Sequence, residues 1–250
     1  MSPKFIQLIS PLIIKPLCEI FNKCFENGVY LDLLKIAKVI PIYKKGKRSE
    51  VGNYRPISVL SVLNKVFEKI IYKRLHSFFD KYKLFYEFQF GFRGGHSTTQ
   101  ALIEILDKIR DSITKGNIVC GIFADLSKAF DTVDHQILLE KLNHYGVRGN
   151  ALNLIKNYLY NRKQYVQIGD IKSCLLPINC GIPQGSVLKP LLFLIYVNDI
   201  ANKCRYGLIR LFADDTNIFI EHSDMKFLMT NVFYPIQPIN NLKLKNSSYS

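Results

Sequence analysis

Residues 208–220, LIRLFADDTNIFI, decide how the rest of the chain is interpreted. Two apolar runs, at residues 208–212 and 218–220, flank a polar tip that carries the adjacent acids Asp214 and Asp215. These runs on either side of Asp-Asp-Thr-Asn predict a β-hairpin, because Asp and Asn are typical turn residues. Carboxylate oxygens on such a tip are the ligands that hard cations such as Mg²⁺ prefer. Two adjacent acids in a turn more often only stabilise the turn, so a metal site requires a third carboxylate from another strand.

A third carboxylate stands at the end of a second predicted strand. Residues 118–124 form a continuous apolar run that is typical of a strand buried on both faces, and the run ends at Asp125. An acid at the end of a buried strand is costly unless it is paired or bound to a metal ion. The sequence therefore indicates that Asp125 joins Asp214 and Asp215 in a cation site.

The charge of the chain indicates a polyanionic partner. The 250 residues contain 34 Lys and Arg but only 20 Asp and Glu, which gives a net charge of +14. Such a basic domain favours nucleic acid first and an anionic membrane second, while a solvated basic surface is the structural alternative. The hydrophobic fraction of 48% is ordinary for a globular protein with a sizeable core.

Cysteine usage and hydropathy predict a soluble intracellular protein without a membrane contact. The six cysteines form no CxxC pair and have no His partner at zinc spacing, which indicates a reducing compartment, nucleus or cytoplasm. Residues 5–14 lack the small-residue cleavage site of a signal peptide. The longest later apolar run, residues 191–197, is far shorter than the ~20 residues that span a bilayer.

Two further stretches predict loops that contact ligands. A strand at residues 36–43, placed at a sheet edge by Pro41, leads into the basic tip KKGKR at residues 44–48. This tip is either a finger that closes on phosphates or a solvated charged loop. The loop GIPQGS at residues 181–186 combines a side-chain amide with glycines that let a ligand approach the backbone. No Gly-Lys-Ser/Thr follows the glycine-rich turn at residues 90–95, so a P-loop is not supported.

Several stretches carry helix signals, which fade near the end of the chain. Residues 61–79 carry an apolar stripe at helical spacing. Residues 97–100, STTQ, have the form of a capping box and predict the start of another helix. Residues 221–250 show little periodicity and predict a poorly ordered tail.

An ordered set of motifs points to one family, and the sequence resembles the reverse transcriptase domain of non-LTR (LINE-type, jockey-like) retrotransposons. The matching segments are PIYKKG (41–46), NYRPIS (53–58), QFGFR (89–93), GHSTT (95–99), FADLSKAFDTVD (123–134), GIPQGSVL (181–188), PLLFLIYVND (190–199) and LFADDTN (211–217). They follow the family order and cover about residues 10–220. A group II intron maturase is the alternative polymerase, and the motifs FADD and NYRPIS argue against it.

The resemblance implies an α+β right-hand polymerase with fingers and palm, an antiparallel palm sheet backed by helices, and no thumb. The ranges expected from it are a helical lead-in (1–35), fingers (36–117), palm (118–220, with a fingers-side insertion near 150–185) and a degenerate tail (221–250). The implied activity is RNA-directed DNA polymerisation, in which a dNTP is joined to the 3′-hydroxyl of a DNA primer on an RNA template.

The resemblance also implies a two-metal catalytic site. Asp125 matches the aspartate that ends the first palm strand, and Asp214 matches the first aspartate of the hairpin pair; in the family both hold metal ions. Asp215 matches the second hairpin acid, which supports catalysis, and the backbone carbonyl of Leu126 matches a further metal ligand. The expected cofactor is a pair of Mg²⁺ ions, with Mn²⁺ as the alternative, since two cations about 3.5–4 Å apart activate the primer hydroxyl and neutralise the leaving group.

Five further positions match residues that contact substrates in the family. Phe130 matches the aromatic that closes off the 2′ position of the sugar, and Gln184 matches the glutamine that contacts the incoming nucleotide. Lys44 and Arg55 match finger residues that grip its phosphates, and Arg93 is expected to contact nucleic acid. The structural alternatives are a core aromatic for Phe130, a loop hydrogen bond for Gln184 and a structural role for Arg93.

Two departures from the family pattern leave a second hypothesis open. Lys189 stands where the family usually has glycine, and the motifs that follow the hairpin in the family are not recognisable after Ile220. The alternative function is therefore an inactive, truncated remnant that only binds nucleic acid. The template preference, the priming mode and the oligomeric state stay open.

Overall fold

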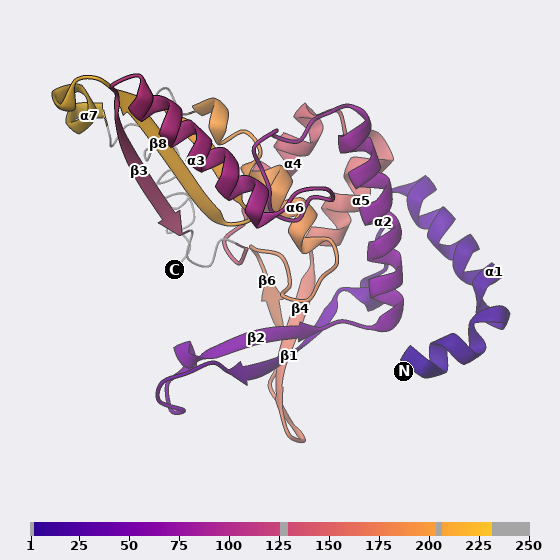
Figure 1. Cartoon of the computed structure of the whole chain (residues 1–250). Coiled ribbons are helices and arrows are strands. Elements are labelled where there is room, and N and C mark those ends of the chain that lie inside the picture. Colours follow the sequence, from indigo (N-terminus) through magenta and orange to yellow (C-terminus); the bar gives the residue numbers. More distant parts are fainter. Residues whose placement is uncertain (1–2, 126–129, 204–206, 232–250) are drawn as a thin grey trace. The chain divides into compact units, whose positions relative to one another are not determined.

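A computed structural model describes residues 3–125, 130–203 and 207–231, and it divides into two units (Figure 1). The first unit combines Met1–Phe79 with Val133–Leu192, and the second combines Asp80–Thr132 with Phe193–Ser250. The first unit thus joins two segments that are distant in the sequence. The division of the chain into lead-in, fingers, palm and tail stays a prediction.

The first unit is built from a mixed sheet and long helices. Its strands follow the order β2-β1-β4-β5, with β6 also paired to β4; β1 runs antiparallel to β2 and parallel to β4. The helices are α1 (Pro3–Asn27), α2 (Val62–Lys81, which ends in the second unit), α4 (His135–His144) and α5 (Gly149–Leu159), and the strands are β1 (Ile36–Tyr43), β2 (Tyr54–Val59), β4 (Arg162–Ile168), β5 (Ile171–Lys172) and β6 (Leu176–Ile178). Two short 3₁₀ helices, Asp32–Leu34 and Val51–Asn53, precede β1 and β2.

The predicted edge position of β1 is wrong, because β2 and β4 flank this strand on its two sides. β1 pairs with β4 only from Ile36 to Val39. Pro41 lies beyond that pairing and opposite Pro56 of β2. Its missing N–H therefore removes no hydrogen bond to β4, which explains how a proline is accommodated in a flanked strand.

The core of the first unit confirms the amphipathic helix predicted at residues 61–79. Phe67, Ile71, Leu75 and Phe79 recur every four residues on α2, and all are buried. The ring of Phe67 stacks on Phe21 of α1 with 4.4 Å between the centroids. This apolar stripe joins α2 to α1.

The amino-terminal helix is the one part of the described residues that meets the length and hydropathy of a membrane span. The segment Lys4–Asn27 is long and apolar enough to cross a membrane, by length and composition alone, and 6% of its most apolar window is buried. Signal sequences and the core helices of soluble proteins pass the same test. Several apolar side chains of this helix are exposed, including Leu8 and Leu12.

The second unit contains a three-stranded antiparallel sheet in the order β3-β8-β7. Its elements are α3 (Thr98–Thr114), β3 (Ile118–Asp125), the 3₁₀ helix Ala201–Lys203, β7 (Leu208–Phe212), β8 (Asp215–His222) and α7 (Met225–Asn231), while α6 (Lys189–Val197) begins in the first unit and ends in the second. Ser97 and Gln100 form the predicted capping box at the start of α3. The packing of α3 against β3 and β7 covers part of this sheet.

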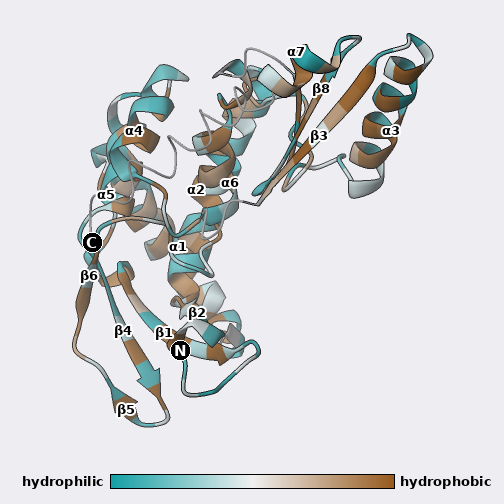
Figure 2. Ribbon diagram, turned by 90° about the vertical axis from the view of Figure 1, so that its left-hand side faces the viewer, coloured by the Kyte–Doolittle hydropathy of each residue, from teal (hydrophilic) through white to brown (hydrophobic). Residues whose placement is uncertain are grey.

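Two local predictions fail in the second unit. None of the residues at positions 118–124 of β3 is buried, although the strand is apolar along its length (Figure 2). β3 lies at the edge of its sheet, and Phe123 is 74% exposed. The expected absence of regular structure after residue 220 is also wrong for α7, in which Leu228 is buried. Residues 232–250 of the predicted tail lie outside the described residues.

Candidate functional site

The predicted hairpin is formed by β7 and β8, with a two-residue turn at Ala213 and Asp214. Phe212 and Asp215 are the last paired residues before the turn. Ala213 has φ of +56°, a left-handed conformation that is uncommon for a residue with a side chain. Asp214 is half-buried and Asp215 is exposed. The turn therefore presents two carboxylates on a strand-supported tip.

The sheet register brings the third predicted acid beside this tip. β3 and β8 are antiparallel, and Asp125 is the partner of Asp215 at the end of the ladder. Neighbouring strands lie about 4.8 Å apart, so the backbones of Asp125 and Asp215 are adjacent. Leu126, the predicted carbonyl ligand, lies outside the described residues. The sheet thus gathers the three acids at one end.

The predicted nucleotide-binding loop belongs to the first unit and is tied to β2. The N–H of Ser58 donates to the carbonyl oxygen of Gln184 at 2.7 Å. Gly185 follows with φ of +115°, and a Cβ on this residue would lie 2.5 Å from the carbonyl oxygen of Ser58. A glycine is therefore required where the loop crosses β2.

A buried polar network holds the other side of this loop. Glu68 of α2 is fully buried; its carboxylate accepts the N–H of Val187 at 2.7 Å and the Nδ2–H of Asn64 at 2.8 Å. The hydroxyls of Tyr158 and Ser186 are hydrogen-bonded at 2.7 Å. Burial raises the pKa of Glu68 above its ordinary value, and the bonds from Val187 and Asn64 oppose that shift. No local sequence pattern predicts this network, because the bonds from Val187 to Glu68 and between Tyr158 and Ser186 join residues 119 and 28 positions apart.

Lys44 and Arg55 lie on the β1–β2 hairpin, and both side chains are exposed. The N–H of Lys44 donates to the carbonyl oxygen of Asn53 at 2.8 Å, which closes the basic tip. Arg55 lies in β2 opposite Ile42. The arrangement leaves both cationic groups in solvent, as a contact to phosphates requires.

Phe130 and Arg93 are both packed within the second unit. The ring of Phe130 lies 4.3 Å from that of Phe193 in α6, between centroids. The guanidinium of Arg93 donates to the carbonyl oxygen of Tyr86 at 2.9 Å and lies over the ring of Phe85. Burial lowers the pKa of Arg93 from its ordinary high value. This geometry gives Arg93 a structural role in its own loop, and its contact with nucleic acid stays a prediction.

A model of the family described as reverse transcriptase (RNA-dependent DNA polymerase) matches residues 42–237. The chain belongs to the reverse transcriptase family. The match extends beyond Ile220, where the short motifs end.

Retrotransposon proteins are among the relatives of this reverse transcriptase chain. It is 33% identical to the RNA-directed DNA polymerase from mobile element jockey of Drosophila melanogaster over 221 residues, which cover 85% of this chain and 24% of the relative. The probable RNA-directed DNA polymerase from transposon X-element of the same species is 34% identical over 201 residues, covering 78% of this chain and 22% of the relative. The chain spans about a quarter of the length of these relatives. The matches confirm the non-LTR resemblance.

Solved structures confirm the α+β fold. Apo telomerase from Candida tropicalis truncated from the C-terminal domain has a TM-score of 0.57 and 13% identity, covering 86% of this chain and 47% of that one. Telomerase from Candida albicans in complex with a TWJ fragment of telomeric RNA has a TM-score of 0.58 and 14% identity, covering 82% of this chain and 41% of that one. At these identities the likeness concerns the fold alone.

Membership of the reverse transcriptase family implies dependence on divalent metal ions. The residue types at the end of the hairpin sheet fit such ions, since the register places the backbone of Asp125 beside that of Asp215, next to the turn at Asp214, and aspartate is an oxygen donor of the kind they prefer. Among the groups whose side chains the structure describes, no cluster of three His, Cys, Asp or Glu is arranged as a metal site. The fit therefore depends on donor chemistry and strand register.

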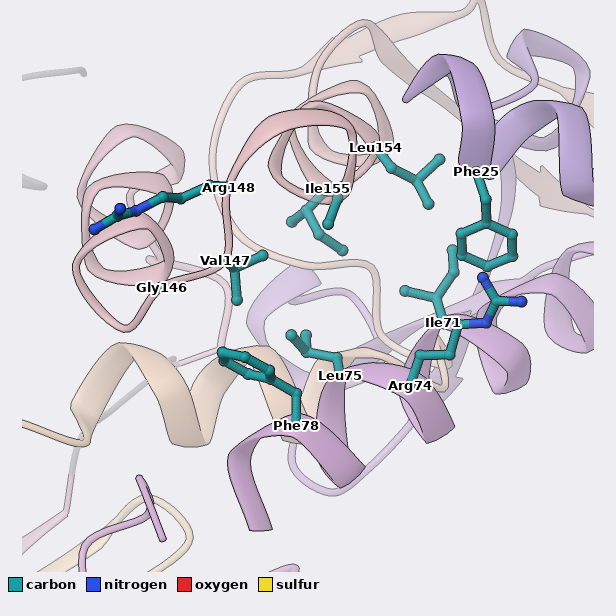
Figure 3. A pocket seen from close by; sticks show the side chains of 11 residues that line it. Phe25, Ile71, Arg74, Leu75, Phe78, Gly146, Val147, Arg148, Leu154 and Ile155 are labelled. Atoms are coloured by element: carbon teal, nitrogen blue, oxygen red, sulfur yellow. The ribbon is translucent and has the colours of Figure 1, made fainter. Parts of the chain in front are cut away.

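An apolar cavity of about 430 Å³ lies elsewhere in this reverse transcriptase chain, between α1, α2 and α5 (Figure 3). Phe25, Ile71 and Leu154 are among its lining residues. The guanidinium of Arg74 lies over the ring of Phe25, 3.9 Å from its centroid. None of the predicted site residues lines this cavity, so it is not the candidate active site.

Proposed function

We propose that this chain forms the nucleotidyl-transfer region of a retrotransposon reverse transcriptase, which joins dNTPs to a DNA primer on an RNA template. The observation that carries the proposal is the strand register that pairs Asp125 with Asp215 beside the turn at Asp214. Asp125, Asp214 and the carbonyl of Leu126 would hold two Mg²⁺ ions, with Mn²⁺ as the alternative, and Asp215 would support that site. When bound, the ions supply Lewis-acid activation of the primer hydroxyl and charge relief at the leaving pyrophosphate.

The other predicted residues position the substrates in this proposal. Phe130, held against Phe193, limits the space at the 2′ position of the sugar and favours deoxynucleotides. Gln184 contacts the incoming nucleotide from a loop whose main chain is fixed to β2. Lys44 and Arg55 bind its phosphates, for which an exposed guanidinium is well suited. These exposed cations and the net charge of +14 support a polyanionic substrate.

Primer extension tests the proposed activity directly. The substrate is oligo(dT) annealed to poly(rA), with dTTP and Mg²⁺, and the variants are Asp214→Asn and Asp107→Asn. Asp107 is an exposed acid of α3, so its substitution makes the same charge change in the same unit. We expect extension by wild type and Asp107→Asn, and only background extension by Asp214→Asn.

A different result in the same assay would contradict the proposed activity. If wild type does not extend the primer, while RNA binding persists in wild type and Asp214→Asn and weakens with added salt, the proposed activity is wrong for this chain. A salt-dependent interaction of that kind needs only phosphate contacts. The inactive-remnant hypothesis would then hold.

A further inference from the structure

Gln89 is a buried amide that contacts the turn carrying Asp214. The residue is 2% exposed. Its Oε1 accepts the N–H of Gly91 at 2.9 Å and the N–H of Ala213 at 3.1 Å. Both partners are donors, so the oxygen and not the nitrogen of the amide must face them. The orientation of Gln89 is therefore fixed by its surroundings.

The segment that carries Gln89 packs closely against β7 and its turn. The N–H of Phe90 donates to the carbonyl oxygen of Leu211 at 2.8 Å, and the N–H of Leu211 donates to that of Phe88 at 3.0 Å. A Cβ on Gly91 would lie 2.1 Å from the backbone nitrogen of Ala213. Main chain thus meets main chain here, and only a glycine leaves the space for that approach.

The turn needs an added restraint, because Ala213 has φ of +56° directly before Asp214. A residue with a side chain keeps this conformation only where the surroundings hold it. The ladder between β7 and β8 ends at Phe212 and Asp215, so it does not include Ala213. Among the described residues, the acceptor for the N–H of Ala213 is Oε1 of Gln89.

The two ends of the Gln89 amide differ in their hydrogen bonding. Nε2 of Gln89 is buried, and within the part of the chain that the structure describes it has no hydrogen-bond partner. A buried donor without a partner destabilises the folded state; an apolar side chain of the same length would remove that donor but would also take the acceptor from the N–H groups of Gly91 and Ala213. The acceptor oxygen is therefore the feature that this position requires.

We propose that Gln89 is a positioning residue for Asp214: its side-chain oxygen holds Ala213 in the left-handed conformation and so fixes the direction of the next residue's carboxylate. The inference rests on the proposed function, in which Asp214 holds a divalent metal ion. Gln89 itself does not touch substrate or metal. Its effect on the reaction passes entirely through the backbone of Ala213.

The test compares Gln89→Met, which keeps the side-chain length without the acceptor, with Gln89→Glu, which keeps an acceptor oxygen. Phe88→Leu is the matched control, because it alters packing in the same segment and leaves both bonds of Gln89 in place. The measurements are amide hydrogen exchange at Ala213 and Leu211, and binding of Mn²⁺ alone followed by its electron paramagnetic resonance signal. Asp214→Asn is included in the Mn²⁺ titration.

We expect Gln89→Met to speed exchange at Ala213 and not at Leu211, and to weaken Mn²⁺ binding by about 10-fold, the size usual for outer-shell residues. Gln89→Glu should restore the protection of Ala213, and Phe88→Leu should leave Mn²⁺ binding unchanged. Wild-type exchange at Ala213 in Gln89→Met, or wild-type Mn²⁺ affinity despite faster exchange, would overturn the positioning role. If Asp214→Asn also binds Mn²⁺ as wild type does, the proposed metal function fails too, and the two failures are thereby separated.

Discussion

The loop at residues 181–188 and the turn at residues 213–214 both carry predicted site residues, but the fold supports them in different ways. The loop has no strand ladder along its own length and is held at separate points by a main-chain bond from Ser58 of β2 and by the side chains of Glu68, Tyr158 and His135. The turn closes a ladder of paired strands, and a single amide reaches its backbone.

This difference predicts where each region is sensitive to substitution. The loop depends on buried polar groups of α2, α4 and α5 that are distant in the sequence. The hairpin depends on main-chain pairing, with Arg210 of β7 as its main buried charge. A substitution in the buried polar groups around the loop should therefore loosen the loop, whereas a substitution at the partner of Arg210 should leave the turn in place, and the following variants test that contrast.

Glu68→Ala should have the largest effect. It removes the acceptor for the N–H of Val187, which is half-buried, and for the buried Nδ2–H of Asn64, and it leaves a cavity beside α2. We expect the free energy of unfolding to fall by about 4 kcal/mol. Hydrogen exchange along a urea series, followed in peptides from residues 181–188, measures it. Glu140→Ala, an exposed acid of α4, is the control, and equal effects of the two variants would contradict the role of Glu68.

Glu104→Ala tests the hairpin side. The carboxylate of Glu104 accepts Nη2–H of Arg210 at 2.7 Å, and Arg210 is 3% exposed while Glu104 is 30% exposed. Removing one partner of a largely buried pair is costly, but solvent at Glu104 reduces the loss to about 2 kcal/mol. Asp107→Ala on the same helix is the control.

Hydrogen exchange in Glu104→Ala shows whether the strands of the hairpin and its turn are supported separately. Exchange should rise in β7 and α3, while the amide of Ala213 stays protected, because its bond to Gln89 remains. Equal loss of protection at Ala213 would show that the turn has no support independent of Arg210.

Tyr158→Phe should have a smaller effect, of about 1 kcal/mol, because it removes one hydrogen bond without creating a cavity. The hydroxyl of Ser186 keeps the N–H of Leu188 as a donor at 3.0 Å. A double-mutant cycle with Ser186→Ala isolates the contact. Additive losses of stability in that cycle would mean that the bond contributes nothing to the loop.

The sequence predicted the hairpin far better than the support of the loop, and the reason is physical. Turn residues between apolar runs and an acid at a strand end are local signals, and they located Asp125, Asp214 and Asp215 in one sheet. The pairing of Glu68 with Val187 joins residues 119 positions apart, and no local pattern encodes it. Burial of β3 was predicted wrongly, since apolar composition does not reveal whether a strand lies at a sheet edge.

Arg93 shows the same limit for a single side chain. Its place in the QFGFR motif suggested a contact with nucleic acid, but its guanidinium donates to the carbonyl oxygen of Tyr86, seven residues earlier. A motif identifies which residues matter without showing what they touch. Gln89 in the same motif bonds to Ala213, 124 positions away, a contact that the motif does not reveal.

The smallest predicted effect is the pH dependence that His135 gives to the loop. His135 is 5% exposed, and its Nε2 lies 2.8 Å from the carbonyl oxygen of Gly181, so the neutral ring donates there. Burial lowers the pKa of His135 below its ordinary value of 6.5, although the carbonyl of Gly181 and the charge of Asp134 oppose the shift. The unfolded chain therefore binds the proton more readily than the folded one.

Stability from this group is consequently complete above about pH 6.5 and is lost as the pH falls toward the lower folded-state pKa. We expect a loss of less than about 1 kcal/mol between pH 7.5 and 5.5, measured by urea unfolding. Glu68 acts in the opposite sense, because its raised pKa makes stability fall as the pH rises above its ordinary value of 4.5. His135→Gln keeps a hydrogen-bond donor and does not titrate. The contribution of His135 is therefore the difference between wild type and this variant in the slope of the unfolding free energy against pH. Identical slopes would show that protonation of His135 does not weaken the attachment of the loop at Gly181, and the loop's support would then lie with Glu68 and Tyr158.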